Sequence, residues 1–488
     1  MESQLIPILV VFPIIVSVIL NLMHGKNHLR LLVLALGLVI IALPFTADYG
    51  LHTFGGHLRG VSARSLAPGI VYTFNSQKML SILVLSLICY LAIIAYLGAF
   101  RQPSGVYLSF LIVGIASATA VILTDDIFNF YVFMEIALIS QTALVIATGT
   151  IQSVKASVKY LIVGNVAMNL VLLAIGLILA SVGSLNISDI QRYMTALGDG
   201  FLTQPTLLLA AGLLIFGWAY SSGLFPFHSI KSEMYGSAEP HAAGFIQTMT
   251  KFILVSYAII LLRIFSGVPT VRPLMLALSM GAMIFGVVMA LRQDDYRRLL
   301  SFHAVSQAGY VAGGLSIGTP LGIAAGIFHA VNHVLYKSAL FIGCEVIKYR
   351  SKTTDFHKLG GAIVGIPFVG ALVLGAKFAI SGIPPFNGFQ SKLMLLKAAM
   401  GVGMPEIALV MILVSIATFA SMMKAFYMVY LKAKEGEVVE EPVPATHVLA
   451  LIILVGLCVL LGLYPDLALR YIMPVATNLG SPWPGGVP

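Results

Sequence analysis

Charged residues are scarce in this sequence. Only 10% of its 488 residues are Asp, Glu, Lys or Arg, and 59% are hydrophobic, whereas soluble domains carry roughly 25% charged residues. A water-soluble globular fold is therefore excluded, because too few charges are present to cover its surface. Apolar runs long enough to cross a bilayer recur instead, and they predict an all-α polytopic membrane protein with about 14 transmembrane helices.

Cysteine is scarce as well. Cys89, Cys344 and Cys458 lie far apart inside apolar runs and show no CxxC spacing. This pattern suggests neither a disulfide framework nor a zinc or iron–sulfur site, so we expect no cofactor in this chain. The net charge of +9 is not taken as a sign of nucleic-acid binding, because basic residues of a membrane protein must first be sorted by membrane side.

Basic loop residues predict the orientation. More of them follow odd-numbered spans than even-numbered ones, which places the odd-numbered loops in the cytoplasm and both termini outside a cell membrane. The first apolar run begins near Ile6, follows Glu2 and lacks a cleavage signal, so we expect a retained span instead of a signal peptide. The expected divisions are N-terminal helices (1–100), a first repeat (101–266), a second repeat (267–430) and a C-terminal helix with its tail (431–488).

Two predicted spans are too long and contain Gly and Pro. The seventh covers 204–236 and the twelfth 362–397, whereas a span needs about 20 residues. Ser222-Gly-Leu-Phe-Pro-Phe-His-Ser-Ile-Lys-Ser-Glu233 aligns without a gap on Ser381-Gly-Ile-Pro-Pro-Phe-Asn-Gly-Phe-Gln-Ser-Lys392. Interrupted spans at matching places are typical of transporters built from repeats. Since the breaks lie five spans apart, we expect two inverted five-helix repeats with broken seventh and twelfth helices.

Ionisable residues within spans are functional candidates, because a charge at the bilayer centre costs about 2.5–3.5 kcal/mol on insertion scales. Glu135 lies in the middle of its span, and Lys251 is the partner that we propose for it. A proton relay would use such a pair. The alternatives are a carboxyl kept neutral by burial and a lysine that extends toward the membrane surface.

His329, His333 and Lys337 form the densest candidate group. Residues four apart lie along one side of a helix, so the three would span about 12 Å of membrane depth as a proton wire. Two buried structural histidines are the alternative. A zinc site is not expected, because Ala330 stands where the HExxH motif requires glutamate and no third ligand is evident.

Lys392 follows the second interruption directly. A lysine beside a broken helix can lie against unpaired backbone carbonyls, and Glu233 occupies the aligned position in the first half. Further candidates are His228, Lys231, Lys377 and His303.

Several stretches together resemble one family. They are the Glu135 span, Gly223–His228, Leu291–Ser301 with the following Ser306-Gln-Ala-Gly309, Phe328–Phe341 and Ser381–Phe389. The chain resembles the antiporter-like membrane subunits of respiratory complex I (types L, M and N), those of membrane-bound hydrogenases, and the D-type subunits of Mrp sodium/proton antiporters.

The resemblance implies two half-channels joined by a polar axis. It identifies Glu135 with the family's fifth-span glutamate, Lys251 with its eighth-span lysine and Lys392 with its twelfth-span lysine or glutamate. His329, His333 and Lys337 match its eleventh-span relay. Ser221 departs from the family, which usually has lysine seven residues before the histidine of the first break.

The expected function is ion translocation without redox catalysis by this chain. The ion is the proton, with exchange for sodium left open, and the expected partners are the bilayer and other membrane subunits of a complex I-like, hydrogenase-like or Mrp-type complex. A short tail that ends in Ser481–Pro488, together with Lys392, resembles the N and D types. A non-conducting assembly scaffold and a stand-alone intramembrane hydrolase are the alternatives.

Overall fold

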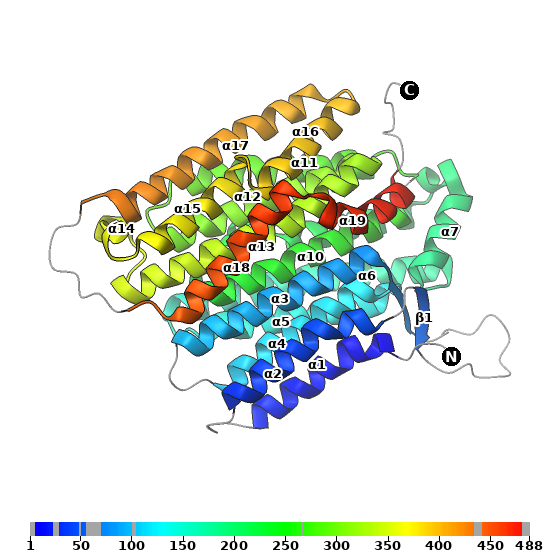
Figure 1. The fold of residues 1–488 in the computed structure, drawn as a ribbon. Helices are drawn as coiled ribbons and strands as arrows, with labels where there is room; N and C mark the ends of the chain where they lie inside the picture. Colours follow the sequence, from blue (N-terminus) through cyan, green and yellow to red (C-terminus); the bar gives the residue numbers. More distant parts are fainter. Residues whose placement is uncertain are drawn as a thin grey trace.

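The computed structural model describes residues 5–22, 29–47, 50–54, 70–99, 104–265, 267–433 and 442–480, and it is almost wholly helical (Figure 1). The Ser481–Pro488 tail lies outside these residues. The longer helices are α1 (Leu5–Leu22), α2 (Leu29–Ala42), α3 (Ser76–Ala99), α4 (Gly105–Leu123), α5 (Ile127–Ile146), α6 (Ile151–Val182), α7 (Ile187–Leu197), α8 (Pro205–Ser222), α9 (His228–Ser237), α10 (Pro240–Ile264), α11 (Val271–Leu291), α12 (Tyr296–Ile317), α13 (Pro320–Ser351), α15 (Pro367–Ser381), α16 (Asn387–Gly401), α17 (Pro405–Phe426), α18 (Ala445–Leu463) and α19 (Asp466–Leu479).

Short elements complete the described chain. A hairpin pairs β1 (Gly50–Phe54) with β2 (Ile70–Phe74) in antiparallel register. The short helical segments are η1 (Leu43–Thr46), η2 (Gly198–Thr203), η3 (Phe356–Lys358), α14 (Ala362–Gly365) and η4 (Tyr427–Leu431).

Apolar helices dominate, as predicted. Among the described residues, nine helices are long and apolar enough to cross a membrane, and three further apolar helices are shorter. The helices α12, which carries His303, and α13, which carries His329 and His333, are not among these nine. The polytopic all-α class is confirmed, and the total of about 14 spans stays a prediction.

Both interruptions lie where the sequence predicts them. The first separates α8 from α9, and the second separates α15 from α16. Gly223 and Gly382 end the leading helices with φ of 69° and 83°, the left-handed conformation that glycine adopts without steric cost.

The two halves share one backbone plan. The helices α6 and α13 both have 32 residues, and backbone bridges join Asp126 to Asn186 and Asp295 to Asp355. Both bridge residues and the starts of the two long helices are numbered 169 higher in the second half than in the first. In Figure 1, α7 follows the first bridge at the right end of the bundle and α14 follows the second at the left end. The halves are therefore inverted, while the exact domain boundaries stay a prediction.

The core centres on α13. This helix packs against α10, α12, α16 and α18, and every residue from Gly322 to Ile347 is buried. Its counterpart α6 lies at the periphery, where Ile151 and Ile162 are 78% and 61% exposed. The polar groups of α13 are therefore enclosed by protein, which is how a membrane protein tolerates them.

Candidate functional site

Lys392 lies at the second helix break. Its Nζ donates hydrogen bonds to the carbonyl oxygens of Ile380 (2.9 Å) and Ser381 (3.4 Å), at the end of α15. The side chain crosses Gly382, where an added Cβ would lie 2.9 Å from Lys392 Cδ. The broken helix thus supplies carbonyl groups for a lysine that has no carboxylate in salt-bridge range among the described residues.

The stripe on α13 begins next to this lysine. His329 contacts Ser391 Oγ through Nδ1 (2.9 Å) and Gln307 Oε1 through Nε2 (3.1 Å). His333 and Lys337 are fully buried, and their side-chain nitrogens have no hydrogen-bond partner among the described residues. Buried polar groups are normally hydrogen-bonded, so these two side chains are exceptions within the described core.

His303 and Lys377 extend the site toward α17. His303 Nε2 lies 2.9 Å from Ser421 Oγ, and Lys377 Nζ donates to the Met422 carbonyl at 3.4 Å. His303 lies within electrostatic range of Lys377 and of the lysines at 337 and 392. The structure therefore gathers His303, Lys377, Lys392 and the α13 stripe around the second break.

The first break also carries a buried lysine. Lys231 donates from Nζ to Tyr160 Oη (2.7 Å) and Gln141 Oε1 (3.2 Å), and its stem crosses Gly223. Ser221 and Lys231 line one cavity of about 10 Å³, room for about one water molecule. Lys231 therefore brings a buried ammonium group to the cavity that Ser221 also lines.

Glu233 and His228 lie apart from this centre. Glu233 forms an ion pair with Lys159 at 2.7 Å, and both side chains are partly exposed. His228 stacks on Phe225 and on the exposed Phe285, with ring centroids 5.8 and 5.7 Å away. The spatial counterpart of Lys392 is consequently Lys231 and not the aligned Glu233.

Lys251 lies near charged groups of both halves. It is 1% exposed on α10 and lies within electrostatic range of Lys231, His333 and Lys337. Glu135 is half-buried and is near the phenol groups of Tyr131, Tyr160 and Tyr220. No salt bridge joins Glu135 to Lys251 in the described part of the chain.

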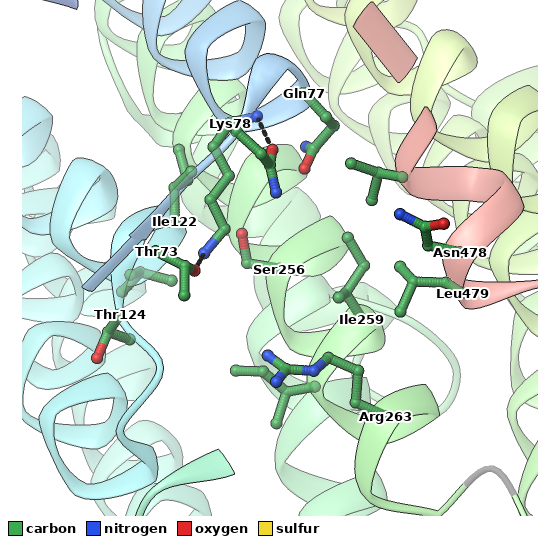
Figure 2. Close-up of a pocket in the computed structure, with 14 residues that line it drawn as sticks. Thr73, Gln77, Lys78, Ile122, Thr124, Ser256, Ile259, Arg263, Asn478 and Leu479 are labelled. Carbon is green, nitrogen blue, oxygen red and sulfur yellow. Dashed lines mark hydrogen bonds between the residues drawn. The ribbon is translucent and has the colours of Figure 1, made fainter. Parts of the chain in front are cut away.

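A polar cavity at the α7 end of the bundle was missed from the sequence. It measures about 260 Å³ and lies between α3, α10 and α19; Figure 2 shows Lys78 and Arg263 on its wall. Lys78 Nζ donates to Thr73 Oγ1 (2.5 Å) and the Leu123 carbonyl (3.2 Å), and Arg263 pairs with Asp125 at 2.5 Å. These groups come from separate elements, so no spacing along the chain pointed to them.

Comparisons with known proteins indicate the family of this chain. Residues 124–421 match the family described as NADH:quinone oxidoreductase/Mrp antiporter, transmembrane. An uncharacterized protein of Methanocaldococcus jannaschii is 46% identical over 97% of this chain and 98% of its own length. The D subunit of a Na⁺/H⁺ antiporter from Alkalihalophilus pseudofirmus is 28% identical over 97% of each chain.

Two solved structures share the fold. A chain of the Mrp complex from Dietzia superposes with a TM-score of 0.86 at 22% identity, covering 98% of this chain and 97% of its own. A chain of the membrane-bound sulfane sulfur reductase, an archaeal respiratory membrane complex, gives 0.86 at 24% identity and covers 98% of both. At 22% and 24% identity, these two superpositions show that the fold is shared and show nothing more.

Proposed function

Because this chain belongs to the NADH:quinone oxidoreductase/Mrp antiporter membrane family, we propose that it is an ion-translocating subunit of a multisubunit membrane complex. The relatives and neighbours named above belong to an antiporter, to an Mrp complex and to a respiratory complex. Redox chemistry and any cofactor are assigned to other subunits. The odd-numbered loops lie in the cytoplasm and the termini outside the cell membrane, following the distribution of basic residues.

The observation that carries the proposal is the pair His333 and Lys337. Both are fully buried and have unpaired nitrogens in the described structure. Both lie within electrostatic range of Lys251, and Lys337 also lies within range of Lys377. A buried cation without a counter-charge is costly, so each group can hold a proton briefly and give it up. A charge on one group also disfavours a charge on the next, which moves protons stepwise.

The proton is the ion that this axis fits. Its groups are imidazole and amine nitrogens, which bind protons, whereas hard metal cations prefer cages of oxygen ligands. The relay that we propose consists of Glu135, Lys231, Lys251, His329, His333, Lys337 and Lys392, with His303 and Lys377 beside it. Exchange for sodium is assigned to the complex as a whole.

Replacement of Lys392 by alanine tests the proposal. The complex with K392A is assembled in membrane vesicles, and proton flux is followed with a pH-sensitive dye. We expect flux to fall to the background of vesicles without the subunit. The matched control is K397A, because Lys397 lies on the same helix and is exposed. Unchanged flux in an assembled K392A complex would overturn the relay and favour the scaffold alternative.

A further inference from the structure

Four helices bring titratable groups together at the α14 end of the bundle, which is the cytoplasmic end in the proposed orientation. Tyr107 lies at the start of α4, His241 at the start of α10, Glu345 near the end of α13 and His447 at the start of α18. Their exposed fractions are 7%, 1%, 4% and 0%. They form a buried cluster that the relay described above does not include.

Hydrogen bonds connect Tyr107, His241 and Glu345 in a row, and His447 lies beside them. Tyr107 Oη lies 2.7 Å from His241 Nε2, and His241 Nδ1 lies 2.6 Å from Glu345 Oε1. His447 Nε2 is 3.8 Å from the same carboxylate oxygen. The second oxygen, Glu345 Oε2, has no hydrogen-bond partner among the described residues. With Glu345 ionised, Nδ1–H donates to the carboxylate, and Nε2 accepts from Tyr107.

A cavity connects the cluster with the surface. It measures about 560 Å³ and is lined by Tyr107 and His241. Its wall also includes Val106 and Ile146, which are 37% and 41% exposed, so the cavity reaches the outside of the chain. Glu239, also on its wall, is paired with Lys348 at 2.6 Å. The cavity therefore leads from the outside of the chain to the hydroxyl and imidazole groups.

The cluster also continues the α13 stripe. Glu345 follows Lys337 by eight residues, which places it about 12 Å farther along the helix axis. Each four-residue step turns about 40°, so the titratable groups wind around α13 from α12 and α16 to α10 and α18. Phe341 occupies the intermediate step, with its ring centroid 5.6 Å from Lys337 Nζ.

We propose that Tyr107, His241, Glu345 and His447 form a proton-loading site that takes protons from the cavity and delivers them to Lys337. The ligand is the proton itself. This proposal rests on the proposed function, because the site delivers its protons to Lys337, a member of the proposed relay. His447 supplies a second imidazole, 3.8 Å from the carboxylate.

The number of protons on the site is the same before and after each complete transfer. A hydronium ion in the cavity gives a proton to the Tyr107 oxygen as the Tyr107 proton passes to His241 Nε2, and a neutral water is left behind. His241 Nδ1 then gives its proton to Glu345, and water between Glu345 and Lys337 carries it the remaining distance to the Lys337 amine. One proton has left the cavity and one has reached Lys337. His241 is left with its proton on Nε2, and a reorientation of the side chain that turns this N–H toward Glu345 and the bare Nδ1 toward Tyr107 prepares the next transfer.

The short contact argues against a metal at this place. Two ligands of one tetrahedral zinc ion lie about 3.3 Å apart, whereas His241 Nδ1 and Glu345 Oε1 are 2.6 Å apart. That separation fits a shared proton. Within the described part of the chain, no group of three His, Cys, Asp or Glu is placed to hold a metal ion.

The test compares E345Q with two companions in the assembled complex in vesicles. Glutamine keeps the shape and can accept from His241, but it cannot carry a proton, so we expect proton flux to fall by at least about tenfold. Y107F removes a single hydroxyl group and should slow flux several-fold. The control is E406Q, which changes an exposed acid in the first turn of α17 and should leave flux unchanged.

The outcomes separate this site from the proposed function. If K392A abolishes flux while E345Q and Y107F leave it unchanged, the loading site is wrong and the relay stands. If K392A also has no effect, the proposed function itself fails. If E345Q does not assemble, Y107F decides: flux at the parental level in assembled Y107F overturns the loading site. Stoichiometric zinc in the parental complex that disappears in E345Q would also overturn it.

Discussion

The first and second halves of this chain share a backbone plan but differ in the chemistry of their longest helices. The helices α6 and α13 have equal length and corresponding numbering, 169 residues apart. The positions that carry His329, His333 and Lys337 on α13 carry Tyr160, Gly164 and Met168 on α6. Only the second half therefore has a buried row of titratable nitrogens on its long helix, because the lysines of α6, Lys155 and Lys159, are exposed.

The helix breaks are more alike than these long helices. Each has a left-handed glycine with a lysine side chain across it, namely Lys231 over Gly223 and Lys392 over Gly382. Their partners differ, because Lys231 donates to Tyr160 and Gln141 whereas Lys392 donates to backbone carbonyls. Both breaks thus have a lysine. We assign the row of relay groups that continues from this lysine, His329, His333 and Lys337, to the second half.

Removal of Lys337 should have the largest effect. K337M is expected to abolish proton flux, since no other group bridges His333 and the Glu345 cluster on α13. Assembly should be retained, because Lys337 Nζ has no hydrogen-bond partner in the described structure and replacing a buried charge by an apolar group is often neutral or stabilising. Proton flux and the yield of assembled complex are measured together. Normal proton flux in assembled K337M would contradict the assignment of the relay to the second half.

Loss of Lys231 should have a smaller effect. In K231M we expect a several-fold reduction in flux, because protons loaded at Glu345 reach Lys337 without passing the first break. Adding S221K to this variant should restore part of the flux, since both positions line the same cavity. Failure of S221K to change the flux of K231M would contradict the spatial equivalence of positions 221 and 231.

The glycines sharpen the comparison further. Alanine at Gly223 or Gly382 should cost about 1 kcal/mol or more of stability, because the backbone conformation is left-handed. Each added Cβ also displaces the lysine that crosses it. Thermal unfolding should shift similarly in both variants, while flux should fall more in G382A. A larger flux loss in G223A than in G382A would indicate that the first break, not the second, lies on the main proton path.

The smallest effect is expected at the aligned position of the first half. E233Q breaks a partly exposed ion pair with Lys159, which is worth about 0–1 kcal/mol. Flux and melting temperature should stay within error of the parental complex. A marked loss of flux would restore Glu233 as the counterpart of Lys392.

Local patterns explain what could be predicted from the sequence. Gly and Pro inside overlong apolar runs located both breaks, and four-residue spacing located the stripe of His329, His333 and Lys337. The alignment failed to pair Lys231 with Lys392, because α9 brings its lysine over the glycine two residues earlier than α16 does. A gapless alignment cannot show which lysine side chain extends over the glycine at a break.

The loading site could not be found in this way, because its four groups come from four helices. One signal was available: Glu345 continues the four-residue spacing of the stripe beyond Lys337. Its partners at 107, 241 and 447 become visible only when α4, α10 and α18 are packed around α13. Tertiary packing, not local pattern, creates this cluster.

The central claim is that protons cross through the second half of the chain. It is tested most directly by proton flux in vesicles that contain assembled K392M or K231M complexes, measured side by side. We expect background flux for K392M and a clearly measurable fraction of parental flux for K231M. Equal loss in both variants, or a greater loss in K231M, would contradict the claim.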